Sequence, residues 1–134
     1  MLRSARISED TLVQRDMELI RKVLLAIEKA PELDRRSKYV IHQSAQLGLA
    51  DCPTPDVIYQ LILLIEAGLI SGTSANDGPM ITGLTWQGHE FLDDVRDDDT
   101  WTKTKERAKS VGSWSLGILT EIAKAEIKMR LGLH

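Results

Sequence analysis

Basic residues are missing from the whole middle of this chain, although they are common on either side of it. No Lys or Arg occurs between residues 39 and 95, whereas nine lie between Arg3 and Lys38 and eight between Arg96 and Arg130. The same stretch contains seven acidic residues, so its formal charge is −7. Surfaces that bind DNA obtain much of their affinity from Lys and Arg on phosphates, so this stretch is unsuited to direct contact with DNA.

Cysteine and long apolar runs are also scarce. Cys52 is the single cysteine among 134 residues, so the chain cannot form an internal disulfide. The longest apolar run, Leu61–Ile65, is far below the roughly 18 residues that cross a bilayer. The first ten residues lack the apolar core of a signal peptide. These absences predict a cytoplasmic protein without a membrane span.

The sequence also lacks the motifs of enzymes and metal sites. It has no phosphate loop, nucleotide fingerprint or nucleophile elbow. His42, His89 and His134 do not have metal-ligand spacing, and Cys52 has no cysteine partner. The aspartates between residues 93 and 99 could be drawn as a magnesium or calcium cluster, but three of them fit better as acids that begin a helix. We therefore expect no catalytic residue, no cofactor and no metal, and predict that the protein is not an enzyme.

Apolar periodicity predicts two helices in the first half of the chain. Apolar side chains recur at helical spacing from Met17 to Ile27, with Asp16 or a Thr11–Gln14 capping box at the start and Pro31 at the end. A second helix, Pro55–Ala67, is predicted to have Thr54 as its cap and to stop at Gly68.

The segment between these helices is ambiguous. In Tyr39–Leu49, apolar residues fit a short helix, but Tyr39, Ile41 and Gln43 could also alternate along a strand. The helix is the favoured prediction, and the structure of Tyr39–Pro53 stays open at this point.

A hairpin and three further helices are predicted after Gly68. Strands from Leu69 to Ser74 and from Met80 to Leu84 flank a turn at residues 76–79. Thr85 is the expected cap of the next helix. Later helices are expected at Trp101–Ser110, ending at Gly112, and at Leu116–Leu131. In the last of these, Ile118, Ile122, Ala125 and Met129 lie on one stripe, and apolar residues on other sides, including Ile127 and Leu131, could let it bridge subunits.

This order of elements predicts a mainly α fold with a small β-hairpin. Helix, short element, helix, hairpin and helix is the arrangement of a winged helix-turn-helix, here followed by two C-terminal helices. We expect residues 1–14 to form an N-terminal arm and residues 15–96 the winged-helix domain. Residues 97–134 would be a helical extension that packs on this domain or on a partner subunit.

Several segments support a resemblance to a known family. Leu64–Ile70 is similar to the end of a winged-helix third helix entering its wing, and Leu84–Leu92 resembles the exit from that wing. Together with Arg15–Lys22 and Trp101, these segments make the chain resemble a family of short bacterial and phage-encoded proteins of unknown function. The resemblance covers about residues 15–133. It implies a winged-helix-like fold and a phage or prophage setting, and it brings no known activity.

The predicted recognition helix, Pro55–Ala67, has no basic residue, and neither has the wing. Major-groove recognition relies on Lys and Arg for phosphates and on Arg for guanine, so contact with nucleic acid through this helix is unexpected. A different surface could contact DNA if the first helix lies beside Trp101–Ser110. Its candidate residues are Arg21, Lys22, Lys103 and Arg107.

The same helix is apolar around nearly its whole circumference, which requires burial on more than one side. Either the C-terminal helix or a second copy of the chain would cover it, since an open patch of several hundred Å² is unusual for a monomer. We predict a homodimer, with an unknown protein partner as a further option, and a regulatory or adaptor function. The interface candidates are Ile58, Ile62, Leu63, Trp114 and Ile127. Trp86 and Trp101 are expected in the core, whereas Trp114 is expected nearer the surface.

Overall fold

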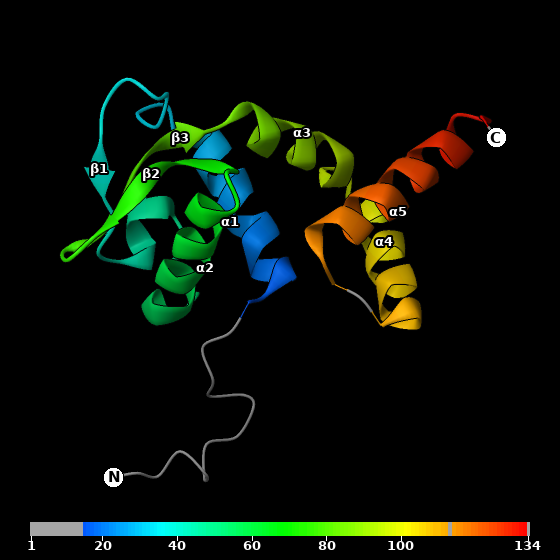
Figure 1. Cartoon of the computed structure of the whole chain (residues 1–134), viewed down its shortest axis with the longest axis horizontal. Coiled ribbons are helices and arrows are strands. Elements are labelled where there is room, and N and C mark those ends of the chain that lie inside the picture. The colour runs from blue at the N-terminus through cyan, green and yellow to red at the C-terminus, as the bar shows by residue number, and fades with distance from the viewer. Residues whose placement is uncertain (1–14, 113, 134) are drawn as a thin grey trace, which may run out of the picture.

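The computed structural model describes residues 15–112 and 114–133, which are mainly helical with one small sheet. The elements in chain order are α1 (Met17–Lys29), β1 (Tyr39–Val40), the 3₁₀ helix η3 (Ser44–Leu47), α2 (Thr54–Glu66), β2 (Ile70–Ala75), β3 (Gly78–Leu84), α3 (Trp86–Val95), α4 (Asp98–Val111) and α5 (Leu116–Arg130). Figure 1 shows α1, α2 and the sheet on one side of the molecule, α4 and α5 on the other, and α3 between them.

The sheet has three antiparallel strands in the order β1-β3-β2, so the last strand in sequence is the central one. Tyr39 pairs with Ile81, and Ile70 pairs with Leu84. The β2–β3 register shifts between Ser71 and Gly72. A Cβ atom on Gly72 would lie 2.3 Å from the Met80 carbonyl oxygen, so the close approach of the strands at this bulge requires glycine.

The predicted ambiguity at Tyr39–Leu49 resolves into a short strand followed by a 3₁₀ turn. The favoured single helix was therefore wrong, and the strand alternative holds for Tyr39 and Val40. The Gln46 side chain explains the difference. Its Oε1 accepts hydrogen bonds from the His42 and Gln43 amides at 2.6 and 2.8 Å, and its Nε2 donates to the Val40 carbonyl at 3.0 Å. These bonds satisfy the backbone without a helix.

Capping side chains fix most of the helix starts. Asp16 caps α1 and accepts from the amides of Glu18 and Leu19, which confirms one of the two predicted starts. The alternative start at Thr11–Gln14 lies outside the described residues. Thr85 accepts from the Gly88 amide at the start of α3, as predicted. Each such cap typically stabilises a helix by about 1 kcal/mol.

The predicted cap of α2 is shifted by one residue. Pro53 is the N-cap, and Thr54 is already the first helical residue. The Thr54 hydroxyl instead accepts from the Ser44 amide at 3.1 Å, at the beginning of η3. The side chain expected to cap one helix therefore ties that helix to the preceding turn.

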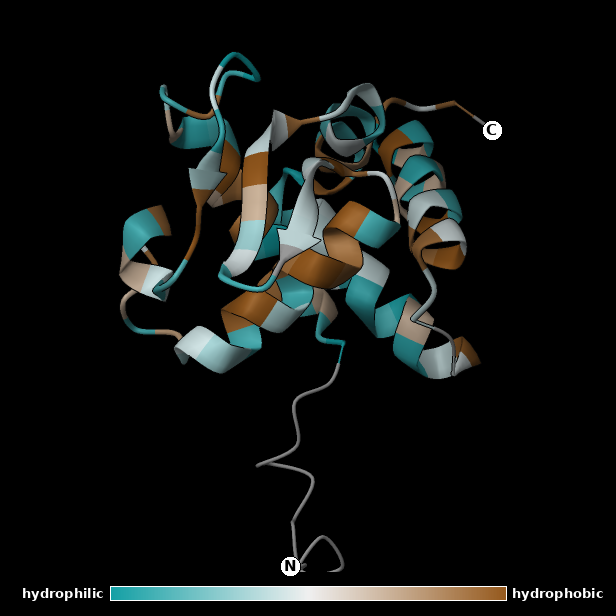
Figure 2. Ribbon diagram, turned by 60° about the vertical axis from the view of Figure 1, so that its left-hand side comes forward, coloured by the Kyte–Doolittle hydropathy of each residue, from teal (hydrophilic) through white to brown (hydrophobic). Residues whose placement is uncertain are grey.

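The core lies between α1, α2, α3 and the sheet, and continues under α4 and α5. Figure 2 shows hydrophobic residues along most of α2. Fully buried side chains come from every one of these layers, among them Val23, Leu24, Leu61, Ile81, Leu92, Trp101 and Leu119. No helix in the described part of the chain is both long and apolar enough to cross a membrane.

The aspartates of residues 97–99 begin α4, which starts three residues before the predicted Trp101. Asp97 is the N-cap, and its carboxylate accepts from the Thr100 amide at 2.8 Å. The helix ends at Gly112, which has the left-handed φ of 73° and is the predicted break. The chain then returns as α5, which packs on α4 and α3 rather than along α2 (Figure 1).

The orientation of α5 was not predicted from the sequence, and that of Trp86 was predicted wrongly. On α5, the stripe of Ile118, Ile122, Ala125 and Met129 is largely exposed, and the buried positions are Leu119, Ala123 and Glu126. Because apolar residues occur on both sides of α5, periodicity alone could not choose the buried one. Trp86, expected in the core, is 72% exposed at the first position of α3. Trp101 is buried as predicted.

Candidate functional site

The outward-facing side of α2 carries apolar residues that the rest of the described chain leaves partly open. Val57, Leu61 and Leu64 face inward and are at most 2% exposed. Tyr59 is exposed, and Ile62 and Leu63, three and four residues further on, are half-buried. We call Tyr59, Ile62 and Leu63 the α2 outer face. The C-terminal helix does not cover this face, although it was one of the two elements predicted to do so.

A buried amide fixes the position of α2 against α1. Gln60 is 1% exposed, and its Oε1 accepts from the Asp16 amide at 3.0 Å. Removing one partner from a buried hydrogen bond costs more than the bond itself contributes, so this contact makes other orientations of α2 unfavourable. The outer face of α2 is therefore presented from a fixed helix.

A pocket of about 270 Å³ lies at the end of α2. Its wall is mostly apolar and joins three helices: Met17 and Ile20 of α1, Leu63 and Leu64 of α2, and Leu116 of α5. Arg15 and Glu66 also line it, and both are exposed. The apolar surface of the α2 outer face thus continues through Leu63 into a shallow hollow.

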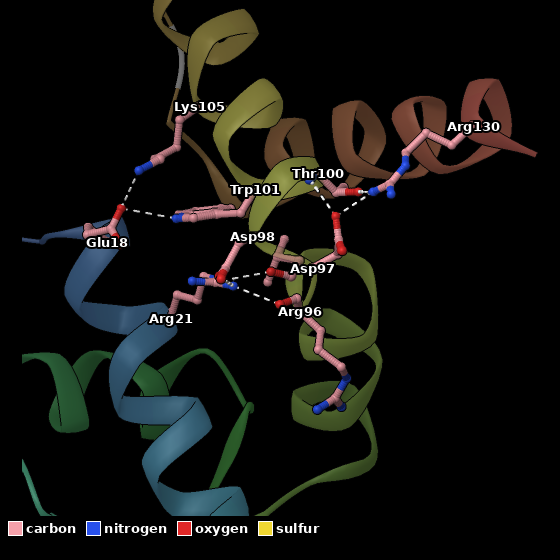
Figure 3. Close-up of polar contacts among 10 residues, drawn as sticks. Glu18, Arg21, Arg96, Asp97, Asp98, Thr100, Trp101, Lys105 and Arg130 are labelled. Atoms are coloured by element: carbon pink, nitrogen blue, oxygen red, sulfur yellow. Dashed lines mark hydrogen bonds and ion pairs between the residues drawn. The ribbon is translucent and has the colours of Figure 1, made fainter.

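Arg21, a predicted DNA contact, is buried inside the molecule (Figure 3). Its Nε donates to the Val95 carbonyl, and its Nη2 donates to the Arg96 carbonyl, both at 2.7 Å. Nη2 also donates to the Asp98 carboxylate at 2.8 Å. Arg21 therefore satisfies carbonyls at the end of α3 and an acid at the start of α4, and its charge faces protein rather than solvent.

Trp101 lies at the centre of the contact between α1 and α4 (Figure 3). Its Nε1 donates to Glu18 at 3.0 Å, and the Lys105 ammonium donates to the same carboxylate at 2.6 Å. The charged groups of Arg21 and Lys105 each lie 5.7 Å from the centre of the Trp101 ring. Burial alone would raise the pKa of Glu18, but the bonds from Lys105 and Trp101 outweigh it and leave the pKa lowered.

The other candidate basic residues are mostly paired as well. Lys103 lies 3.4 Å from Asp99, and Arg107 lies 2.6 Å from Glu126, whose side chain is 5% exposed. Lys22 is exposed and has no ion pair within residues 15–112 and 114–133. Of the four predicted nucleic-acid contacts, Lys22 alone presents a cation without an intramolecular partner in the described structure.

The acidic residues between 93 and 99 are mostly bound to cations of the same chain. Asp93 pairs with Arg96 at 2.9 Å, and Asp97 with Arg130. The Thr100 amide and the Arg130 guanidinium lower the pKa of Asp97 to about 2. These residues line a cavity of about 760 Å³, but the described chain contains no group of three or more His, Cys, Asp or Glu suited to a metal.

Among the described residues, the other candidate reactive side chains, His42, His89 and Cys52, lie on different segments. His42 and His89 are exposed, and His134 lies outside the described residues. Burial and the neighbouring Asp51 raise the pKa of the Cys52 thiol, which disfavours the nucleophilic thiolate.

The five interface candidates do not form a single patch. Ile58 packs against the core, and Ile127 is half-buried at the cavity beside Asp97. Trp114 is accessible, with 37% of its surface exposed. It lies far from α2 in the sequence, just before α5. Ile62 and Leu63 remain on the α2 outer face. The exposure of Trp86 was not predicted, because this aromatic residue was assigned to the core by its type.

These features define a mainly helical protein with a small three-stranded antiparallel sheet. Comparison with known proteins then gives its family. Residues 14–115 match the family described as "Hypothetical protein (DUF2513)", and the chain belongs to this family. It is also similar to an uncharacterised protein of Haemophilus influenzae, with 33% identity over 124 residues, 89% of this chain and 99% of the relative. No solved structure matches the chain.

Proposed function

We propose that this chain is a winged-helix protein. The order α1, β1, η3, α2, β2, β3 corresponds to helix, strand, short second helix, recognition helix and wing. The sheet order β1-β3-β2 fits this assignment, because the wing strands β2 and β3 pair with each other and β1 pairs with the other edge of β3. In this assignment α2 occupies the position of the recognition helix.

We infer further that it is a non-enzymatic protein that acts through protein contacts, in a regulatory or adaptor role. The observation that carries this inference is the α2 outer face. On the helix that would enter DNA, the accessible side chains of Tyr59, Ile62 and Leu63 are apolar or aromatic, and the helix contains no Lys or Arg. Aromatic and aliphatic side chains at the centre of a surface are typical anchors of protein interfaces.

The energetic comparison favours protein over DNA at this surface. A DNA-binding protein commonly makes about 6–10 phosphate contacts through basic residues, whereas α2, β2 and β3 contribute none. Asp56 and Glu66 would be repelled by phosphate. Burial of apolar area at a protein interface instead contributes roughly 25 cal/mol per Å² removed from water.

The alternative function, a DNA-binding regulator with a different basic surface, has weaker support. It depends on Arg21, Lys22, Lys103 and Arg107 acting together. Arg21 of α1 is buried against Val95 and Asp98. The two α4 residues, Lys103 and Arg107, are paired with Asp99 and Glu126. Binding DNA through them would require breaking these contacts, including one to a buried carboxylate.

Light scattering on a size-exclusion column distinguishes the two functions. The protein is run at low and at high salt, with and without a mixed pool of duplex DNA. We expect its measured mass and elution volume to be the same with and without DNA at both salt concentrations. A DNA-dependent shift at low salt that disappears in the Lys103→Glu/Arg107→Glu variant would contradict the proposal. Circular dichroism of the variant is the control for folding.

A further inference from the structure

The last helix carries an apolar surface that the described chain leaves largely open. Leu119 and Ala123 are buried against the rest of the molecule. A second set, which we call the α5 stripe, consists of Ile118, Ile122, Ala125 and Met129. Ile118 is 39% and Met129 53% exposed, Ala125 is exposed, and Ile122 is half-buried.

The spacing of the α5 stripe is that of a helix-pairing seam. Its residues follow one another at steps of four, three and four, which is the alternation of the a and d positions of a heptad repeat. At about 100° per residue they all fall within a narrow sector of the helix surface. The centre of the buried side lies roughly 100° away around the helix, which is the separation expected for a helix that contacts two neighbours in a four-helix bundle.

The charges beside the stripe determine which partner fits. Glu121 and Lys128 are seven residues apart on the same edge of the stripe, and both are exposed. Neither has a hydrogen bond or an ion pair in the part of the chain that the structure describes. In an antiparallel helix pair these equivalent edge positions face each other. A second copy of α5 would therefore place its Lys128 beside Glu121 and its Glu121 beside Lys128, forming two opposite-charge pairs.

The other edge of the stripe is closed by α4. Arg107 binds Glu126 at 2.6 Å, and its Nη2 lies 4.0 Å from the Met129 sulfur. A partner helix must therefore approach from the Glu121 and Lys128 edge. The core layers of such a pair are Ile118 against Met129 and Ile122 against Ala125, each formed twice by the two-fold symmetry.

We propose that the α5 stripe is a homodimer interface, formed by antiparallel pairing of α5 with α5 of a second copy. A contact between two 15-residue helices is smaller than the roughly 1,200–2,000 Å² of a standard interface, so the dimer is a weak one, with dissociation on the order of micromolar or above. The pairing uses residues of α5 and none of the α2 outer face. It does not depend on the function proposed for that face.

Sedimentation equilibrium of charge-exchange variants tests the pairing. Protein concentrations of about 1–500 μM cover dissociation constants in the micromolar range. Glu121→Lys and Lys128→Glu each place like charges opposite each other twice, and we expect each variant to raise the dissociation constant at least about tenfold. The double variant Glu121→Lys/Lys128→Glu restores both pairs and should return within about threefold of the wild type. Glu106→Lys, an equivalent reversal on the exposed side of α4, is the matched control and should have no effect.

A third variant tests the core of the interface. Ala125→Glu places a charge in the middle of the stripe at a position that is exposed in the single chain, so it should abolish the dimer and leave the circular dichroism spectrum unchanged. A wild type that stays monomeric across the whole range overturns the proposal, and so does a double variant that fails to recover. A dimer broken by Tyr59→Glu but not by Glu121→Lys also overturns it, and assigns the contact between copies to the α2 outer face.

Discussion

Two junctions between elements of this molecule differ in chemistry. The contact of α2 with α1 and the sheet is mainly apolar, built on Leu61, Leu64 and their neighbours, and includes the buried Gln60 bonded to the Asp16 amide. The contact of α1 with α4 surrounds the Trp101 ring with Arg21, Glu18 and Lys105. Apolar burial is non-directional, whereas hydrogen bonds and ion pairs require particular geometry. The first junction mainly supplies stability, and the second mainly fixes how the C-terminal helices are oriented.

Replacement of Trp101 by Ala should have the largest effect on stability. The side chain is 2% exposed and both fills the α1–α4 junction and donates to Glu18. We expect a loss of about 3–5 kcal/mol in the free energy of unfolding, measured by urea denaturation. Trp86→Ala is the matched control, because Trp86 is 72% exposed and its removal should change stability by no more than about 0.5 kcal/mol. Equal losses would contradict the placement of both tryptophans.

Leu61→Ala tests the apolar junction by the same method. Leu61 is fully buried between α2 and the core, so its truncation should cost about 2–5 kcal/mol, through lost transfer energy and the cavity left behind. Tyr59→Ala, two residues away on the α2 outer face, should cost under about 1 kcal/mol. If Tyr59→Ala is the more damaging of the two, α2 is rotated relative to this structure.

Arg21→Met removes the directional contacts while keeping much of the side-chain volume. The Val95 and Arg96 carbonyls and the Asp98 carboxylate lose their donor, and we expect a cost of about 2–3 kcal/mol in unfolding free energy. Lys22→Met, at the adjacent exposed position, should stay within about 0.5 kcal/mol of the wild type. Should the two variants behave alike, Arg21 would be a surface residue and the basic-surface function would regain support.

The smallest effect is expected from acidification. The pKa of Asp97 is lowered to about 2, so its contribution is fully present above the unfolded value near 4 and is lost as the pH falls through 2. Between pH 4 and 2 the Tm of Asp97→Asn, which keeps a capping oxygen, should fall less than that of the wild type. Asp77→Asn in the β2–β3 turn is the control. Parallel curves for Asp97→Asn and the wild type would argue against the bonds to Thr100 and Arg130.

Local signals made much of the fold predictable from the sequence. The stripe from Met17 to Ile27, the cap at Thr85 and the break at Gly112 each depend on residues close in the chain, and the structure confirms them. Tyr39 and Val40 form a strand because they pair with β3, some forty residues away, and no local pattern reveals that pairing.

The candidate surfaces were less predictable for a related reason. The apolar character of α2 was evident from the sequence, but which of its residues stay accessible depends on where α5 packs. For α5 itself, apolar residues lie on two sides of the helix, and the tertiary packing decides which side is buried. Arg21 appeared as one member of a basic run, and its bonds to Val95 and Asp98 depend on the fold as a whole.

Protein contact through the α2 outer face is tested most directly by a photo-crosslinking amino acid in place of Tyr59, in cells that produce the protein. The same substitution at Glu106, on the exposed side of α4, is the control position. We expect a crosslinked species at Tyr59 that is degraded by protease, resists nuclease and is absent at Glu106. A nuclease-sensitive species, or the absence of any product specific to Tyr59, would contradict the assignment of the α2 outer face to protein contact.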